Sequence, residues 1–147
     1  MDATRTKVRP ARISDAAEIS RLSEELGYSS EPKEMTRRLR EILPEGHHAV
    51  IVAAQGERLL GWIHIEHRVS IESGSKCEIV GMVVDTTARR HGVGRNLVQA
   101  AEEWAYSRGL TTLTVRSNTA RKHSHPFYES IGYERVKTQH VYTKKAK

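Results

Sequence analysis

The chain has few aromatic residues, one cysteine and no long apolar run. Aromatic side chains make up 5% of its 147 residues, which predicts an aliphatic core. Because Cys77 is the sole cysteine, no disulfide can form within the chain, and a cytoplasmic location is expected. No apolar run approaches the ~20 residues that span a bilayer. The opening MDATRTKVRP also lacks the apolar core of a signal peptide. These absences predict one soluble domain over residues 1–147, with no membrane partner.

The charge is unbalanced toward the positive side. Lysine and arginine number 24 against 18 acidic residues, a formal net charge of +6. Such a balance favours an anionic partner: nucleic acid, a membrane surface or a phosphorylated small molecule. A nucleic-acid partner is not expected, because the chain has no recognised nucleic-acid motif and few aromatic rings to stack on bases.

The apolar periodicity predicts an α+β fold in the order β-α-α-β-β-β-α-β-α-β, with a mixed central sheet flanked by helices. The run IVGMVV indicates a central strand that is buried on both faces. The predicted strands are 8–12, 49–54, 59–69, 77–85, 110–116 and 133–143, and the predicted helices are 15–26, 32–43, 92–107 and 126–131.

The stretch RRHGVGR joins the central strand to the third helix. The first turn of a helix has unpaired N–H groups and partial positive charge, so it attracts anions. Gly92 and Gly94 allow close approach, and the neighbouring arginines add full charges. The spacing fits neither a P-loop nor a Rossmann fingerprint, because Leu97 stands where each needs a small residue. A phosphate or pyrophosphate seat and a helix start that simply carries arginines both remain open at this point.

Three segments together resemble the GNAT superfamily of N-acetyltransferases. Arg89-x-x-Gly92-x-Gly94 resembles the Q/R-x-x-G-x-G/A signature, EIVGMVVD resembles the long central strand, and HPFYESIGYERV resembles the later helix and strand. The resemblance implies the GNAT fold, with acetyl-CoA as cosubstrate and direct transfer to an amine in a ternary complex. The chain departs from the family pattern at two residues. His91 stands where many members carry Lys or Gly, and Pro126 could tilt the later helix.

The resemblance also implies a set of cofactor-binding residues. The turn would hold the pyrophosphate through its backbone, and the end of the central strand would bond the pantetheine arm, with the Val84 N–H polarising the thioester carbonyl. A polar residue after the fifth strand would contact the same arm. The residues implied are Met82, Val83, Val84, Arg89, Arg90, His91, Gly92, Val93, Gly94, Arg95 and Asn118.

The chemistry needs a base, because an amine with a pKa of ~10.4 is mostly protonated at neutral pH. Glu78 is the candidate base, and strand alternation places it on the face of Val80, Met82 and Val84. A surface glutamate, with water relaying the proton, is the alternative. Tyr128 matches the family tyrosine that protonates the leaving thiolate, and core filling is its alternative.

The acceptor region has several acidic and aromatic residues, which suit the cationic amine of a small molecule. The alternatives are acetylation of a protein N-terminus or lysine, and a non-catalytic module that binds acyl-CoA. No metal is predicted, because His123 and His125 have no cysteine or acidic residue at ligand spacing. Whether the chain forms a homodimer stays open. The acceptor candidates are Glu24, Glu25, Tyr28, Glu31, Glu34, Trp62 and Glu66.

Overall fold

A computed structural model describes residues 5–25, 27, 30–88, 91–116 and 124–146. The chain divides into two compact units, 1–116 and 117–147. The single domain over 1–147 stays a prediction. No helix in the described ranges is both long enough and apolar enough to cross a membrane.

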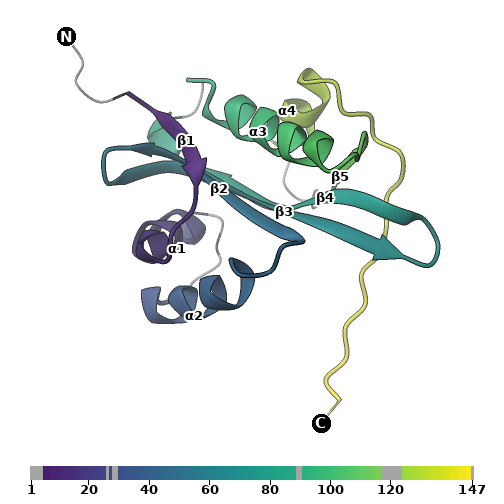
Figure 1. The fold of residues 1–147 in the computed structure, drawn as a ribbon, viewed down its shortest axis with the longest axis horizontal. Helices are drawn as coiled ribbons and strands as arrows, with labels where there is room; N and C mark the ends of the chain where they lie inside the picture. Colours follow the sequence, from purple (N-terminus) through teal and green to yellow (C-terminus); the bar gives the residue numbers. More distant parts are fainter. Residues whose placement is uncertain (1–4, 26, 28–29, 89–90, 117–123, 147) are drawn as a thin grey trace. The chain divides into compact units, whose positions relative to one another are not determined.

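The first unit is built on a five-stranded sheet in the order β1-β2-β3-β4-β5 (Figure 1). Its neighbouring strands are antiparallel except for β4 and β5, which are parallel, so the sheet is mixed, as predicted. The strands are β1 (Lys7–Pro10), β2 (His48–Gln55), β3 (Arg58–Ser70), β4 (Gly74–Val84) and β5 (Leu113–Val115).

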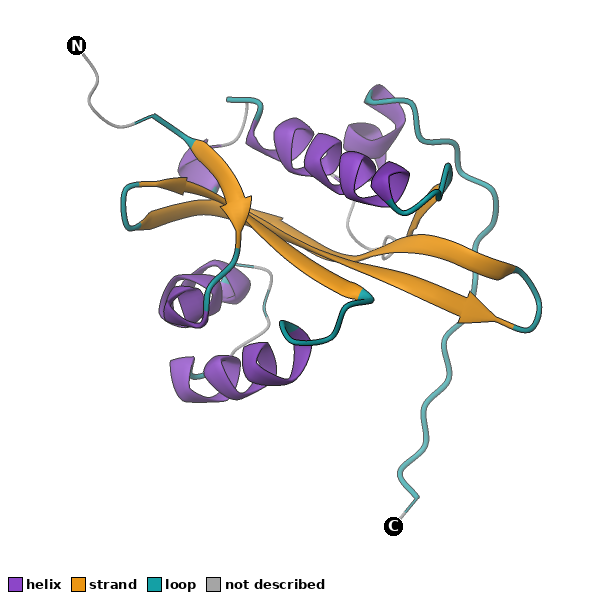
Figure 2. Cartoon of the chain, in the orientation of Figure 1, coloured by secondary structure: helices purple, strands orange, loops and turns teal. Residues whose placement is uncertain are grey.

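Helices cover both faces of this sheet (Figure 2). The helices α1 (Ala16–Glu24) and α2 (Pro32–Ile42) lie on one face, and α3 (Val93–Ser107) lies on the other. Short 3-10 turns precede α1 (η1, Ile13–Asp15) and α3 (η2, Thr86–Ala88). The core between α1, α2 and the sheet is aliphatic, as the composition predicts. Its buried members are Ala16, Ile19, Leu22, Leu39, Val52, Ala54, Leu59 and Val83.

Gly61 in β3 lets α3 approach the sheet closely. A Cβ at this position would lie 2.8 Å from the backbone oxygen of Val83 and 3.0 Å from Leu97 Cδ1. It would also lie 3.2 Å from Val93 Cγ1. Val93 and Leu97 belong to the buried stripe of α3, so the absence of a side chain at Gly61 fixes the distance between the helix start and the strand.

The strand β4 contains a bulge at Val80. His64 pairs with Gly81 and Ile65 pairs with Ile79, so Val80 is an extra residue opposite the β3 ladder. The prediction of burial on both faces holds before the bulge, where residues 77–79 are all buried. It is wrong at Val80, which is 49% exposed. The bulge also reverses the alternation of side chains along β4.

The second unit contains the helix α4 (Ser124–Ser130) followed by residues with no regular secondary structure. The strand predicted over 133–143 is therefore wrong. A strand requires a ladder partner and a buried face, and residues 134–146 have neither among the described residues. Val136 is 82% exposed and Val141 is 85% exposed, which shows that the apolar positions of this segment do not pack.

Candidate functional site

The turn before α3 has the backbone of an anion seat. Gly92 is the N-cap residue, with a φ of 78° in the left-handed region that favours glycine. Its carbonyl accepts the first helical hydrogen bond from Asn96 N at 3.0 Å, and no side chain of the described residues caps the helix start. The N–H groups of the first turn therefore point outward without helical partners. A Cβ on Gly92 would meet none of the described residues within 4 Å.

Of the side chains described around the turn, one is buried and two are exposed. Val93 is buried against the sheet, which holds the start of α3 in place. His91 and Arg95 are exposed, and Gly94 is half-buried. Arg89 and Arg90 lie outside the described residues.

Hydrogen bonds to Asp85 hold in place the segment that leads from the end of β4 toward this turn. Its side chain is 1% exposed and accepts hydrogen bonds from Thr87 N at 2.8 Å and Thr87 Oγ1 at 2.7 Å. Arg21 Nη1 at 3.1 Å and Arg58 Nη2 at 2.9 Å donate to the other carboxylate oxygen. Burial alone would raise the pKa of Asp85, but the bonds from Thr87 and Arg21 outweigh it and lower the pKa to about 2.

The same network attaches α1 to the sheet. Arg21 donates to Glu18 through Nε at 2.8 Å and Nη2 at 3.0 Å, and to the Leu59 carbonyl at 2.9 Å. Glu18 in turn accepts the Leu59 N–H at 3.0 Å. The hydrogen bond to Glu18 is the main reason that the pKa of Arg21 is raised. Sequence reasoning missed this network; its one local signal was Asp85-Thr-Thr directly after a strand, a pattern typical of an Asx turn.

The end of β4 presents an open backbone edge. β5 pairs with Cys77, Glu78 and Ile79 but with nothing beyond the bulge. Residues 82–84 pair with β3 on their other side and have no strand partner toward β5 among the described residues. An extended ligand could therefore bond to Met82, Val83 and Val84 as an additional strand would.

Glu78 is buried between two arginines. Its side chain is 8% exposed, Oε2 lies 3.1 Å from Arg68 Nη1, and Oε1 lies 3.1 Å from Arg116 Nη1. The contact with Arg68 is a hydrogen bond, whereas the contact with Arg116 has the distance of an ion pair without hydrogen-bond geometry. Neither arginine was singled out from the sequence.

The face assigned to Glu78 from the sequence is wrong. Glu78 pairs with Glu66, and Met82 pairs with Ile63. Side chains alternate between the faces along β3, so Glu66 and Ile63, three positions apart, point to opposite faces. Glu78 therefore shares the face of Val83, which packs with α1 and α2, and Met82 points to the α3 face. The bulge at Val80 causes the difference.

A sequence profile of the Acetyltransferase (GNAT) family matches residues 16–133, most of the chain. The chain belongs to the GNAT acetyltransferase family. This assignment agrees with the fold, since the strands β2 to β5, the glycine turn and the open β4 edge all fall within the matched range.

Relatives of this GNAT chain have been named as N-acetyltransferases. It is 36% identical over 67 residues to the uncharacterized N-acetyltransferase YhdJ of Bacillus subtilis (strain 168), which covers 45% of this chain and 47% of that protein. It is 39% identical over 82 residues to aminoglycoside N(6')-acetyltransferase type 1 of Klebsiella aerogenes, covering 52% of this chain and 53% of the relative. The chain thus spans about half the length of the curated relatives it matches.

Solved structures share the fold over nearly the whole chain. Aminoglycoside N-acetyltransferase AAC(6')-Iy, crystallised in complex with CoA, superposes with a TM-score of 0.87 at 17% identity, covering 99% of this chain and 98% of the other. At this level of identity the likeness shows the fold alone.

The remaining GNAT site residues lie in the second unit or outside the described ranges. Tyr128 lies in α4 and is half-buried, with its ring edge-on to Phe127 at 5.2 Å and to Tyr133 at 5.9 Å between centroids. Tyr128 and Glu78 belong to different units, so their roles in one site stay a prediction. Asn118 lies outside the described residues.

Proposed function

We propose that this GNAT chain is an N-acetyltransferase that moves an acetyl group from acetyl-CoA directly to a primary amine of a small molecule. The observation that carries the proposal is the pairing of an uncapped, glycine-started helix with the open edge of the strand that precedes it. The first suits a pyrophosphate and the second suits an extended amide-containing arm, and both features occur together in acyl-CoA.

Each step of the transfer is assigned to a group of this chain. The first-turn N–H groups after Gly92 hold the pyrophosphate, and the exposed Arg95 adds charge. The amine nitrogen attacks the thioester carbon, and the Val84 N–H stabilises the oxyanion that forms. The C–S bond then breaks, and the departing thiolate takes a proton from the Tyr128 hydroxyl.

Glu78 accepts the proton that the amine loses. We expect one water to carry this proton, because the carboxylate is 8% exposed and an arginine lies 3.1 Å from each of its oxygens. Arg68 and Arg116 hold the carboxylate in a fixed position, which a relay of this kind requires.

A cationic small-molecule amine suits the acceptor side best, because α1, α2 and their flanking residues carry several carboxylates. Some of these are already engaged: Glu25 accepts the Thr86 N–H at 3.2 Å, and Glu34 pairs with Arg37 and Arg38. Glu24 and Glu31 are exposed and could attract a cation. The naming of a relative as an aminoglycoside acetyltransferase supports the same class of acceptor.

A CoA-release assay tests the proposal. Acetyl-CoA is combined with a panel of aminoglycosides, a polyamine, amino acid derivatives and a lysine-containing peptide, and the free thiol of CoA is measured. Turnover with a small amine, reduced in Tyr128→Phe, is the expected result. Acetyl-CoA binding without turnover on any amine would instead favour the non-catalytic module, and turnover confined to the peptide would favour protein acetylation.

A further inference from the structure

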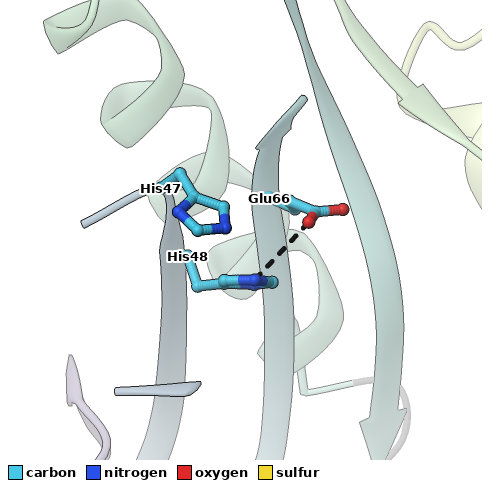
Figure 3. Close-up of side chains that lie close together, drawn as sticks. All are labelled: His47, His48 and Glu66. Carbon is cyan, nitrogen blue, oxygen red and sulfur yellow. Dashed lines mark ion pairs between the residues drawn. The ribbon is translucent and has the colours of Figure 1, made fainter. Parts of the chain in front are cut away.

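Two histidines and a glutamate meet where β2 begins beside β3 (Figure 3). Each of His47, His48 and Glu66 offers one ligand atom, and the three atoms lie within 4.8 Å of one another. His48 is the first residue of β2 and pairs with Glu66 of β3, so the sheet holds these two side chains together. His47 precedes the strand and its ring lies 4.4 Å from that of His48 between centroids.

The spacing of two of these atoms matches a metal site. Zinc binds histidine nitrogen and carboxylate oxygen at about 2.0–2.2 Å, so two ligands of a tetrahedral ion lie about 3.4 Å apart. His48 Nε2 and Glu66 Oε2 are 3.4 Å apart. The side chain of His47 is 50% exposed, so it can rotate toward the same point without disturbing the core.

A second contact orients His48 as a ligand. Its Nδ1 lies 2.9 Å from Nε2 of His64. His64 lies two residues before Glu66 on β3, so the two side chains share one face of the sheet. Metal-bound histidines commonly donate their other ring N–H to a carboxylate, a carbonyl or water, which fixes the ring and leaves the far nitrogen for the metal. In this chain His64 Nε2 takes the place of that acceptor. Here that far nitrogen is Nε2, the atom that faces Glu66. An ordinary ion pair between His48 and Glu66 does not account for the position of His47.

We propose that His47, His48 and Glu66 bind one divalent ion of the zinc class, with water completing its coordination. Two imidazoles and one carboxylate form a ligand set that zinc accepts with one position left open. The site lies apart from the glycine turn, but Arg68 contacts both Glu66 Oε1 at 3.6 Å and Glu78 Oε2 at 3.1 Å. Metal binding is therefore measured directly and not through turnover, so that the failure of one proposal can be told from the failure of the other.

Titration of the tag-free full chain with Zn²⁺ by calorimetry tests this site. We expect one Zn²⁺ per chain, with affinity reduced at least tenfold in both His47→Ala and Glu66→Gln. The control is His140→Ala, since His140 is exposed in the second unit and belongs to no such cluster of described residues. Thermal unfolding without metal checks that each variant is folded, and the exposure of His47 makes its replacement mild.

Co²⁺ gives a second readout, because its visible absorption reports coordination by protein ligands. The band expected with the wild-type chain should weaken in His47→Ala and Glu66→Gln but persist in His140→Ala. An absence of Zn²⁺ binding by the wild-type chain, or equal Zn²⁺ affinity in all three variants, would overturn the proposal.

Discussion

Replacement of Gly92 by alanine separates a cofactor role of the turn from its structural role. Gly92 has a φ of 78°, and an added Cβ would meet nothing within 4 Å. The cost to folding is therefore backbone strain alone, about 1–2 kcal/mol for a residue with a side chain in the left-handed region. If the turn binds the pyrophosphate, the new methyl group would also keep the anion away from the first-turn N–H groups.

The chain offers a matched control at the other end of the same helix. Gly109 follows α3 with a φ of 79°, and a Cβ there would also meet nothing within 4 Å. Gly92→Ala and Gly109→Ala should thus lose similar stability, a few degrees in melting temperature. Only Gly92→Ala should lose acetyl-CoA affinity, by at least tenfold, which corresponds to about 1.4 kcal/mol.

Two measurements on each variant decide the matter: thermal unfolding without ligand and calorimetric titration with acetyl-CoA. Wild-type affinity in Gly92→Ala would refute the reasoning that places the pyrophosphate at this turn. An equal loss of affinity in both variants would attribute the effect to a strained helix instead of a blocked seat.

Three further changes test the base, the buried carboxylate and the close approach of α3. Glu78→Gln should lower kcat at least tenfold in the CoA-release assay while acetyl-CoA affinity is kept, and the exposed Glu72→Gln should change neither; an unchanged kcat would remove Glu78 from the mechanism. Because the pKa of Asp85 is lowered from 3.8 to about 2, its ionised form stabilises the fold by about 2 kcal/mol above pH 4, and this stability is lost as the pH falls to 2. Urea unfolding across this pH range should therefore show a shallower loss in Asp85→Asn, and identical slopes would contradict the assignment. Gly61→Ala should destabilise the chain by about 1–3 kcal/mol, because its Cβ would lie 2.8 Å from a backbone oxygen, whereas Gly46→Ala meets nothing within 4 Å and should be nearly neutral.

The strand-turn-helix around Gly92 could be predicted because its signals are local. The glycine spacing marks the turn, and the apolar stripe that begins at Val93 marks the helix, without reference to any distant residue. The strand predicted over 133–143 failed for the opposite reason. Its valine, tyrosine and threonine residues favour a strand locally, but a strand forms only when a partner supplies the ladder and a core covers one face.

The network around Asp85 and the environment of Glu78 could not be predicted because their partners are distant in sequence. Arg21 reaches Asp85 from α1, and Arg68 reaches Glu78 from the neighbouring strand. Nothing in the sequence distinguishes these arginines from the others of a basic chain. Only the register of the sheet and the docking of α1 select them.

The bulge at Val80 affects two parts of the proposed site: the open edge of β4 and the face on which Glu78 lies. Before it, β4 is held between β3 and β5, and Glu78 points to the face covered by α1 and α2. After it, β5 no longer pairs with β4, and the backbone of residues 82–84 has an open edge in the part of the chain that the structure describes. A bulge increases the local twist of a strand, which separates it from a parallel neighbour. A single extra residue thus accounts both for the opening beside the proposed acyl arm and for the placement of the candidate base on the other face. The sequence does not reveal the bulge. The run IVGMVV is apolar throughout, so apolar side chains would be buried with or without an extra residue in the strand.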